Sequence, residues 1–308
     1  STDNLSELSF WPLEAQRPIV IGGYDTSARR PVVFTPDGKW LATCWGQDEL
    51  RLWPLPGNRH REVRELEIES TSVRTGLTID PAGERLLVAG YGEYLFVVPL
   101  DGEEPLRLEG FQSTTFLEKG AFSPTGRLAA AATGFASEEK KLRVWDLETG
   151  EIAVFELPRP VNTAAGEESG LSGRVSNFVV GDLAFADEST LFTAGVIGVL
   201  RWDLETGSYE QLVPARPGQM YRLWLSGDRR RLMTWGNGEC GSLMLHDLAR
   251  GEFQEIKTFA DCGDLEWPER VALDPSLSVL VVGRPDGTLW VDRVGGGTPH
   301  LLTGHEGT

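Results

Sequence analysis

The chain has 308 residues, 40% of them hydrophobic, which is enough to bury a core, and its formal net charge is -17 with an isoelectric point near 4.7. This acidity argues against nucleic acid as a ligand, because binding to phosphates requires a basic face. No apolar run reaches the ~20 residues that cross a bilayer, and the start of the chain is not a secretory signal. The sequence therefore predicts a cytoplasmic protein without a membrane partner.

Seven short segments are variants of one hexapeptide with the pattern Leu-x-x-Trp-x-Leu. Their fourth positions lie 42 to 57 residues apart, and a repeat of about 40 to 45 residues is typical of four-stranded propeller blades. We expect each hexapeptide to form the third strand of a small antiparallel sheet. The predicted third strands are 8–13, 50–55, 95–100, 142–147, 199–204, 243–248 and 289–294.

A predicted hairpin precedes most of these hexapeptides. In the clearest units an apolar first strand ends in a turn with Pro and Gly, as in 32–38 and 120–126, and a second strand follows. Segments such as 61–66 and 253–256 are expected to form a fourth, outer strand. No window shows a helical stripe, so the fold class is all-β. The polar, Gly-rich stretch 158–174 is expected to be a disordered or variable loop insertion.

The pairs Trp145-Asp146 and Trp202-Asp203, the turn 123–126 and the dipeptide Gly304-His305 resemble the signature of the WD-repeat family. The resemblance covers essentially the whole chain and implies a single β-propeller over 1–308, usually with seven blades, that presents its rims and central channel to partners. In the family, the His and Asp of each unit brace the blade through hydrogen bonds. Because most of these residues are replaced here, we expect packing to hold most blades together.

The two ends of the chain bear on the number of blades. Residues 8–13 and 17–21 supply a third and a fourth strand, and 301–308 reads as the lead-in to another first strand. We therefore expect seven blades with one split or incomplete between the termini, because an open ring leaves an unpaired sheet edge. The alternative is a ring of six blades with a loose leading hairpin. We also expect the chain to be a segment of a larger protein, and the predominance of Arg over Lys is typical of GC-rich bacterial genomes.

Chemical motifs are scarce, and the sequence predicts no catalytic residue, no metal site and no cofactor. The three cysteines, Cys44, Cys240 and Cys262, have neither metal-binding spacing nor an even number for disulfides. The glycine-rich stretch 236–241 matches GxGxxG but precedes a strand, so we interpret it as a hairpin rather than a dinucleotide site. The four histidines lie at repeat framework or outer positions, which argues against a His-based site.

Basic residues recur at one position near the start of the predicted first strands. Aligning those strands places Lys119, Arg222 and Arg270 at this position, which in the family approaches the mouth of the channel. Together they would form a basic collar suited to an acidic peptide or anion. The alternative is that they neutralise Asp182, which aligns with them, and neighbouring carboxylates.

Aromatic residues gather in segments expected on the same rim. Tyr91 and Phe135 lie in Gly-flanked loops after second strands, and Arg284 holds an equivalent position. Tyr221 and Trp267 lie near the starts of first strands. Aromatic residues and arginine dominate binding hot spots, so we predict that these residues contact a partner.

The sequence thus predicts a non-catalytic scaffold or sensor module that binds a peptide or partner domain at the rim and channel mouth. One alternative is the regulatory WD-repeat region of a bacterial signalling protein, such as a Ser/Thr protein kinase, which the resemblance alone suggests. Another is a propeller enzyme that acts on a small molecule at the channel, for which only Asp182 and Glu118 lie near the required position. The sequence does not indicate an oligomeric state.

Overall fold

The computed structural model describes residues 6–10, 19–24, 31–45, 49–55, 62–67, 76–89, 94–112, 117–133, 139–159, 180–216, 219–236, 242–258, 271–283, 288–296 and 298–302. These residues fall into a larger unit, Asp25–Pro217, and a smaller unit, Ser1–Tyr24 with Gly218–Thr308, each of which is described by itself. Every regular element in the described ranges is a β-strand.

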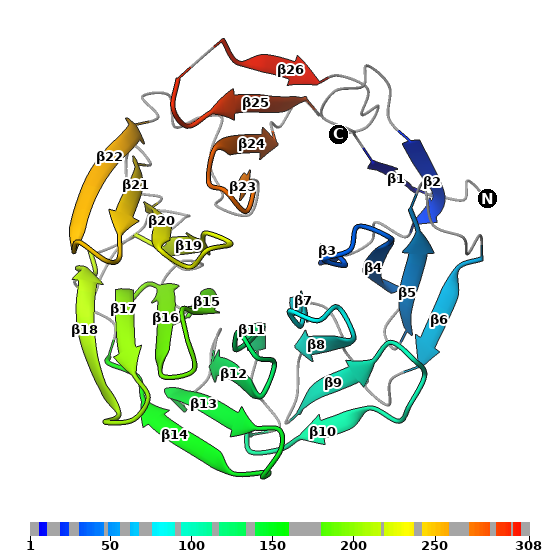
Figure 1. The fold of residues 1–308 in the computed structure, drawn as a ribbon, viewed down its shortest axis with the longest axis horizontal. Coiled ribbons are helices and arrows are strands. Elements are labelled where there is room, and N and C mark those ends of the chain that lie inside the picture. Colours follow the sequence, from blue (N-terminus) through cyan, green and yellow to red (C-terminus); the bar gives the residue numbers. More distant parts are fainter. Residues whose placement is uncertain are drawn as a thin grey trace, which may run out of the picture. The chain divides into compact units, whose positions relative to one another are not determined.

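The larger unit contains four antiparallel sheets, each of four strands that follow one another in the chain (Figure 1). The first sheet is β3 (Val32–Phe34), β4 (Trp40–Trp45), β5 (Glu49–Pro54) and β6 (Arg64–Glu67). The second is β7 (Gly76–Ile79), β8 (Arg85–Ala89), β9 (Leu95–Pro99) and β10 (Leu106–Leu108). The third is β11 (Leu117–Phe122), β12 (Leu128–Thr133), β13 (Lys141–Asp146) and β14 (Ile152–Glu156). The fourth is β15 (Asp182–Phe185), β16 (Thr190–Gly195), β17 (Gly198–Asp203) and β18 (Ser208–Val213).

The smaller unit adds two four-stranded sheets and one two-stranded sheet. The fifth sheet is β19 (Tyr221–Leu225), β20 (Arg231–Gly236), β21 (Ser242–Asp247) and β22 (Glu252–Thr258). The sixth is β23 (Val271–Leu273), β24 (Val279–Gly283), β25 (Leu289–Arg293) and β26 (His300–Leu302). The two-stranded sheet pairs β1 (Ser6–Phe10) with β2 (Ile19–Tyr24).

The all-β prediction of four-stranded antiparallel sheets is confirmed, but the leading expectation of seven blades is wrong. The described residues form six four-stranded sheets, which was the alternative, and β1 and β2 pair with each other. We expect 301–308 to lead into another first strand. In the structure, Leu301 and Leu302 belong to the fourth strand of the sixth sheet, which pairs with β25, and 303–308 lie outside the described residues.

The turn between the first and second strands repeats one set of hydrogen bonds. In five of the six sheets, a side-chain oxygen of the first turn residue accepts the backbone N–H five residues later. The accepting residues are Thr35, Asp80, Ser123, Ser226 and Asp274. Three residues into each of these turns φ is positive, at 66 to 75° in the three turns with Gly and at 57° and 55° where Arg229 and Leu277 stand. Short Asp, Ser and Thr side chains bond to nearby backbone in this way, which fixes the turn.

A second turn, between the third and fourth strands, depends on the aspartate of the repeat. The Oδ1 atom of Asp146 accepts the backbone N–H groups of Glu148 and Thr149. Asp203 and Asp247 make the corresponding bonds in the fourth and fifth sheets. In each turn a glycine at φ 68 to 76° follows. The Asp of each Trp-Asp or His-Asp pair therefore stabilises the hairpin of its own sheet.

The fourth hexapeptide position forms a hydrogen bond inside the sheet. Trp53 Nε1 donates to Thr43 Oγ1 over 2.9 Å, and Trp202 Nε1 donates to Thr193 Oγ1 over 3.0 Å. In the fifth sheet, Nε2 of His246 and Oγ1 of Thr234 are 2.9 Å apart. In each sheet, the Trp or His on the third strand is paired with a leucine on the second strand. The threonine stands two residues after that leucine. These three sheets therefore have a buried side-chain hydrogen bond in addition to their packing.

Three sheets lack the threonine. In one of them the tryptophan is kept and its indole N–H donates to a different acceptor, and in the other two the tryptophan is replaced as well. The third sheet has Ala131 at the threonine position, and Trp145 Nε1 donates instead to the backbone oxygen of Glu109, 3.1 Å away. The second sheet has Val88 and Val98 at the two positions, and the sixth has Val282 and Asp292. A buried indole N–H needs a partner, which explains why both positions differ in the second and sixth sheets and why Trp145 donates to a backbone oxygen in the third.

Candidate functional site

The candidate site lies where the first strands begin, because the predicted collar residues stand there. In the larger unit, β11 contacts β7 and β15, and β3 contacts β7. The first strands of this unit are therefore neighbours, and residues at their equivalent positions can meet (Figure 1).

Lys119 and Asp182 form an ion pair between two of these strands. Lys119 Nζ on β11 lies 2.7 Å from Asp182 Oδ1 at the start of β15. The Asp182 side chain is 2% exposed and that of Lys119 is 37% exposed. A buried carboxylate requires a charged or hydrogen-bonding partner, so Lys119 serves to neutralise Asp182. For Lys119, the geometry therefore matches the alternative interpretation and not that of a partner-binding collar.

Tyr221 and Arg222 stand side by side at the start of β19 but differ in burial. Tyr221 is only 5% exposed, and its hydroxyl donates to Gln219 Oε1 over 2.6 Å. Its ring covers Gly236 so closely that a Cβ there would lie 2.7 Å from Cε1. Tyr221 is thus a core residue, and its predicted place in the contact surface is not supported. Arg222 is half-buried and faces Trp235 across the β19–β20 pair.

The remaining predicted contact residues lie outside the described part of the chain. They are Tyr91, Phe135, Trp267, Arg270 and Arg284. Most of the insertion at 158–174 also lies outside it, because the description of this region stops at residue 159 and resumes at 180. The role of these five residues in contacting a partner stays a prediction.

The described residues contain no group of three or more His, Cys, Asp or Glu side chains that could hold a metal ion. Histidine is a residue type that often serves in catalysis, but His246 is 7% exposed and hydrogen-bonded to Thr234. Burial lowers the pKa of His246, because the charged imidazolium is poorly solvated there. Its neutral ring therefore takes the structural place that tryptophan has in other sheets. Within the same described residues, no helix is long and apolar enough to span a membrane.

Comparison with known proteins identifies the fold. A solved structure described as the β-propeller domain of Cps50 (Swd1) from Myceliophteria thermophila matches with a TM-score of 0.67 and 17% sequence identity. The match covers 91% of this chain and 88% of the other. This chain has a β-propeller fold. Neither a protein-family model nor a curated protein sequence matches it.

Proposed function

We propose that the chain is a WD-repeat propeller that acts as a non-catalytic protein-interaction module. The structural match over 91% of the chain carries this proposal, together with the repeat signature in the sequence. The hydrogen-bonded turns and the ring–threonine bonds support it further, because they fix the sheets and so present side chains at the strand ends in a rigid arrangement. Rigid display lowers the entropic cost of binding a partner.

The contact surface that we propose is the end of the sheets where the first strands begin. Arg222 occupies this end in the fifth sheet, and the sequence places Arg270 at the equivalent position of the sixth. Lys119 is left out of the surface because its ammonium group neutralises Asp182. Two arginines on a chain of net charge -17 suit an acidic segment of a partner protein, to which guanidinium groups can bind in bidentate fashion.

Charge reversal at this surface tests the proposal. The variant Arg222→Glu with Arg270→Glu is compared with a control that carries the same charge change, Arg216→Glu with Arg250→Glu, at two exposed sites. Placing like charges at an interface costs several kcal/mol, so we expect proteins captured by the wild type to be retained at least tenfold less by the first variant and equally by the control. Thermal unfolding followed by circular dichroism checks that both variants are folded. Equal retention by both variants would refute the proposed surface.

A further inference from the structure

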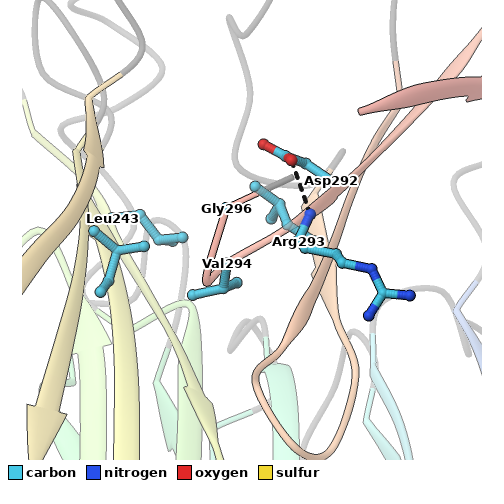
Figure 2. A pocket seen from close by; sticks show the side chains of 7 residues that line it. Leu243, Asp292, Arg293, Val294 and Gly296 are labelled. Carbon is cyan, nitrogen blue, oxygen red and sulfur yellow. Dashed lines mark hydrogen bonds between the residues drawn. The ribbon is translucent and has the colours of Figure 1, made fainter. Parts of the chain in front are cut away.

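A pocket lies between the fifth and sixth sheets. Its volume is about 260 Å³. It is lined by Leu243, Ile256, Leu280, Asp292, Arg293, Val294 and Gly296 (Figure 2). Leu243 and Leu280 are each 1% exposed and form its apolar floor, whereas Arg293 and Gly296 are exposed and mark its mouth. The pocket therefore joins an apolar interior to the surface.

The register shows which side chain takes the corresponding place between the third and fourth sheets. Leu280 faces Asp292 in the sixth sheet as Leu191 faces Trp202 in the fourth. In the fourth sheet, the ring of Trp202 packs in one core cluster with Leu191 and with Leu142 of the third sheet. Asp292 thus stands where another sheet of the same chain has a tryptophan.

The fifth-sheet side of the pocket corresponds to the third-sheet residues that surround Trp202. Phe155 of β14 pairs with Leu142, and its ring centroid lies 6.0 Å from that of Trp202. In the fifth sheet, the pairing of β21 with β22 is irregular after Leu243, which places Ile256 in the equivalent region. Leu243, Ile256 and Leu280 therefore reproduce the surroundings of the Trp202 indole, but an aspartate replaces the indole itself.

A third pair of sheets shows the same use of this space. Trp145 of the third sheet packs against Phe111, which follows the second sheet, with ring centroids 5.6 Å apart. Trp145 and Trp202, which both stand at the fourth hexapeptide position, thus each place their indole against the preceding sheet. Since a cavity of about 150 Å³ lined by Leu, Ile and Phe side chains already holds benzene, a pocket of about 260 Å³ has room for a larger ring.

The substitutions in the sixth sheet also change the polar chemistry of the pocket. Val282 stands at the position of the threonine that accepts the indole N–H in the fourth sheet, so that acceptor is lost. Asp292 supplies a carboxylate instead, and its Oδ1 accepts the backbone N–H of Arg293 over 2.8 Å. The Arg293 side chain points away from the Asp292 carboxylate (Figure 2).

We propose that this pocket binds an aromatic side chain of a partner protein, from a segment in which positive charges flank the aromatic residue. The indole of Trp202 shows that a ring attached to a polypeptide fits between two sheets of this chain. Asp292 and the overall charge of -17 select positively charged neighbours of that ring. The proposal goes beyond the surface around Arg222, since neither Arg222 nor Arg270 lines the pocket.

The test uses the whole chain and short peptides titrated in ligand-observed NMR. The probe is acetyl-Lys-Trp-Lys-amide, with acetyl-Lys-Ala-Lys-amide and acetyl-Glu-Trp-Glu-amide as matched peptides and tryptamine as a small molecule. We expect the Lys-Trp-Lys peptide to bind and both matched peptides to bind at least tenfold more weakly. The variant Asp292→Trp, which fills the pocket with the residue of the fourth sheet, should lose binding at least tenfold and unfold at a higher temperature.

A second variant keeps the test decisive if Asp292→Trp does not fold. Asp292→Asn preserves the size of the side chain, and we expect its preference for the Lys-Trp-Lys peptide over the Glu-Trp-Glu peptide to be at least threefold smaller than that of the wild type. Absence of peptide binding at 5 mM, or equal binding by the wild type and a folded Asp292→Trp variant, would overturn the proposal. Tighter binding of tryptamine than of the peptide would also overturn it and would assign the pocket to free aromatic amines.

The outcome can be separated from that of the proposed function. The variant Arg222→Glu with Arg270→Glu leaves the pocket unchanged and is expected to bind the Lys-Trp-Lys peptide as the wild type does. If that variant loses its partner protein while the wild type fails to bind the peptide, the pocket proposal fails and the proposed function stands.

Discussion

Replacing Thr193 with Val tests the hydrogen bond that fixes the fourth sheet. The substitution removes the Oγ1 atom that accepts the Trp202 indole N–H but keeps the shape of the side chain. Thr193 is 0% exposed and Trp202 is 1% exposed, so water cannot replace the lost acceptor. A buried donor without a partner costs about 1–3 kcal/mol. We therefore expect the free energy of unfolding to fall by about 1–3 kcal/mol, measured by urea denaturation with an unchanged m-value.

A double-mutant cycle separates this bond from a general loss of packing. Trp202→Phe removes the donor, so adding Thr193→Val in that background leaves no indole N–H without a partner. The cost of Thr193→Val should then be smaller by roughly 0.5–3 kcal/mol than in the wild type, which is the range of coupling between contacting residues.

An exposed threonine supplies the control. Thr125 lies in the turn of the third sheet and is exposed, and Thr125→Val should change the free energy of unfolding by less than about 0.5 kcal/mol. The reasoning is refuted if Thr193→Val costs no more than Thr125→Val, or if the effects of Thr193→Val and Trp202→Phe simply add.

Three further predictions concern other parts of the framework. Gly38→Ala should lower the free energy of unfolding by ~1 kcal/mol in urea denaturation, because φ is +66° there while no atom lies within 4 Å of the new Cβ; no loss would remove the argument from backbone strain. The pKa of Asp146 is about 2, held there chiefly by hydrogen bonds from Arg127, so this aspartate stabilises the fold above its unfolded pKa near 3.8 and loses that effect as pH falls through about 2. The stability difference between the wild type and Asp146→Asn should accordingly shrink between pH 5 and pH 2, and a difference independent of pH would contradict this assignment. Lys119→Met should cost about 1–3 kcal/mol, less than the ~3–5 kcal/mol of a fully buried pair because the ammonium is partly exposed, and Lys119→Met with Asp182→Asn should cost less than Lys119→Met alone. If the double variant were the less stable of the two, the ion pair would not explain the burial of Asp182.

The sheets could be predicted from sequence because local residues specify them. The Leu-x-x-Trp-x-Leu elements alternate large side chains on a strand, and the Pro- and Gly-containing turns fix the hairpins that precede them. The strand His300–Leu302 was missed because three residues carry too little pattern to distinguish a last strand from a first one. Six complete blades were predicted correctly, whereas the seventh, split blade was inferred from the two chain ends, and the described residues form no seventh four-stranded sheet.

The candidate site was harder to predict, since it depends on contacts between sheets. Lys119 and Asp182 are 63 residues apart, and the alignment placed them at equivalent positions without showing that they bond to each other. Tyr221 has an aromatic ring at a strand start, but only the structure shows that it covers Gly236. The pocket had one available signal: Asp292 replaces tryptophan while Val282 replaces its threonine partner.

Hydrogen exchange of the chain, alone and with a purified protein partner, tests the central claim most directly. An interaction module that uses the strand starts should show slower exchange there on binding, first of all at the start of β19 around Arg222, in a stable complex of fixed stoichiometry. The absence of any stable protein complex, or protection confined to the outer strands β6, β10, β14 and β18, would contradict the account.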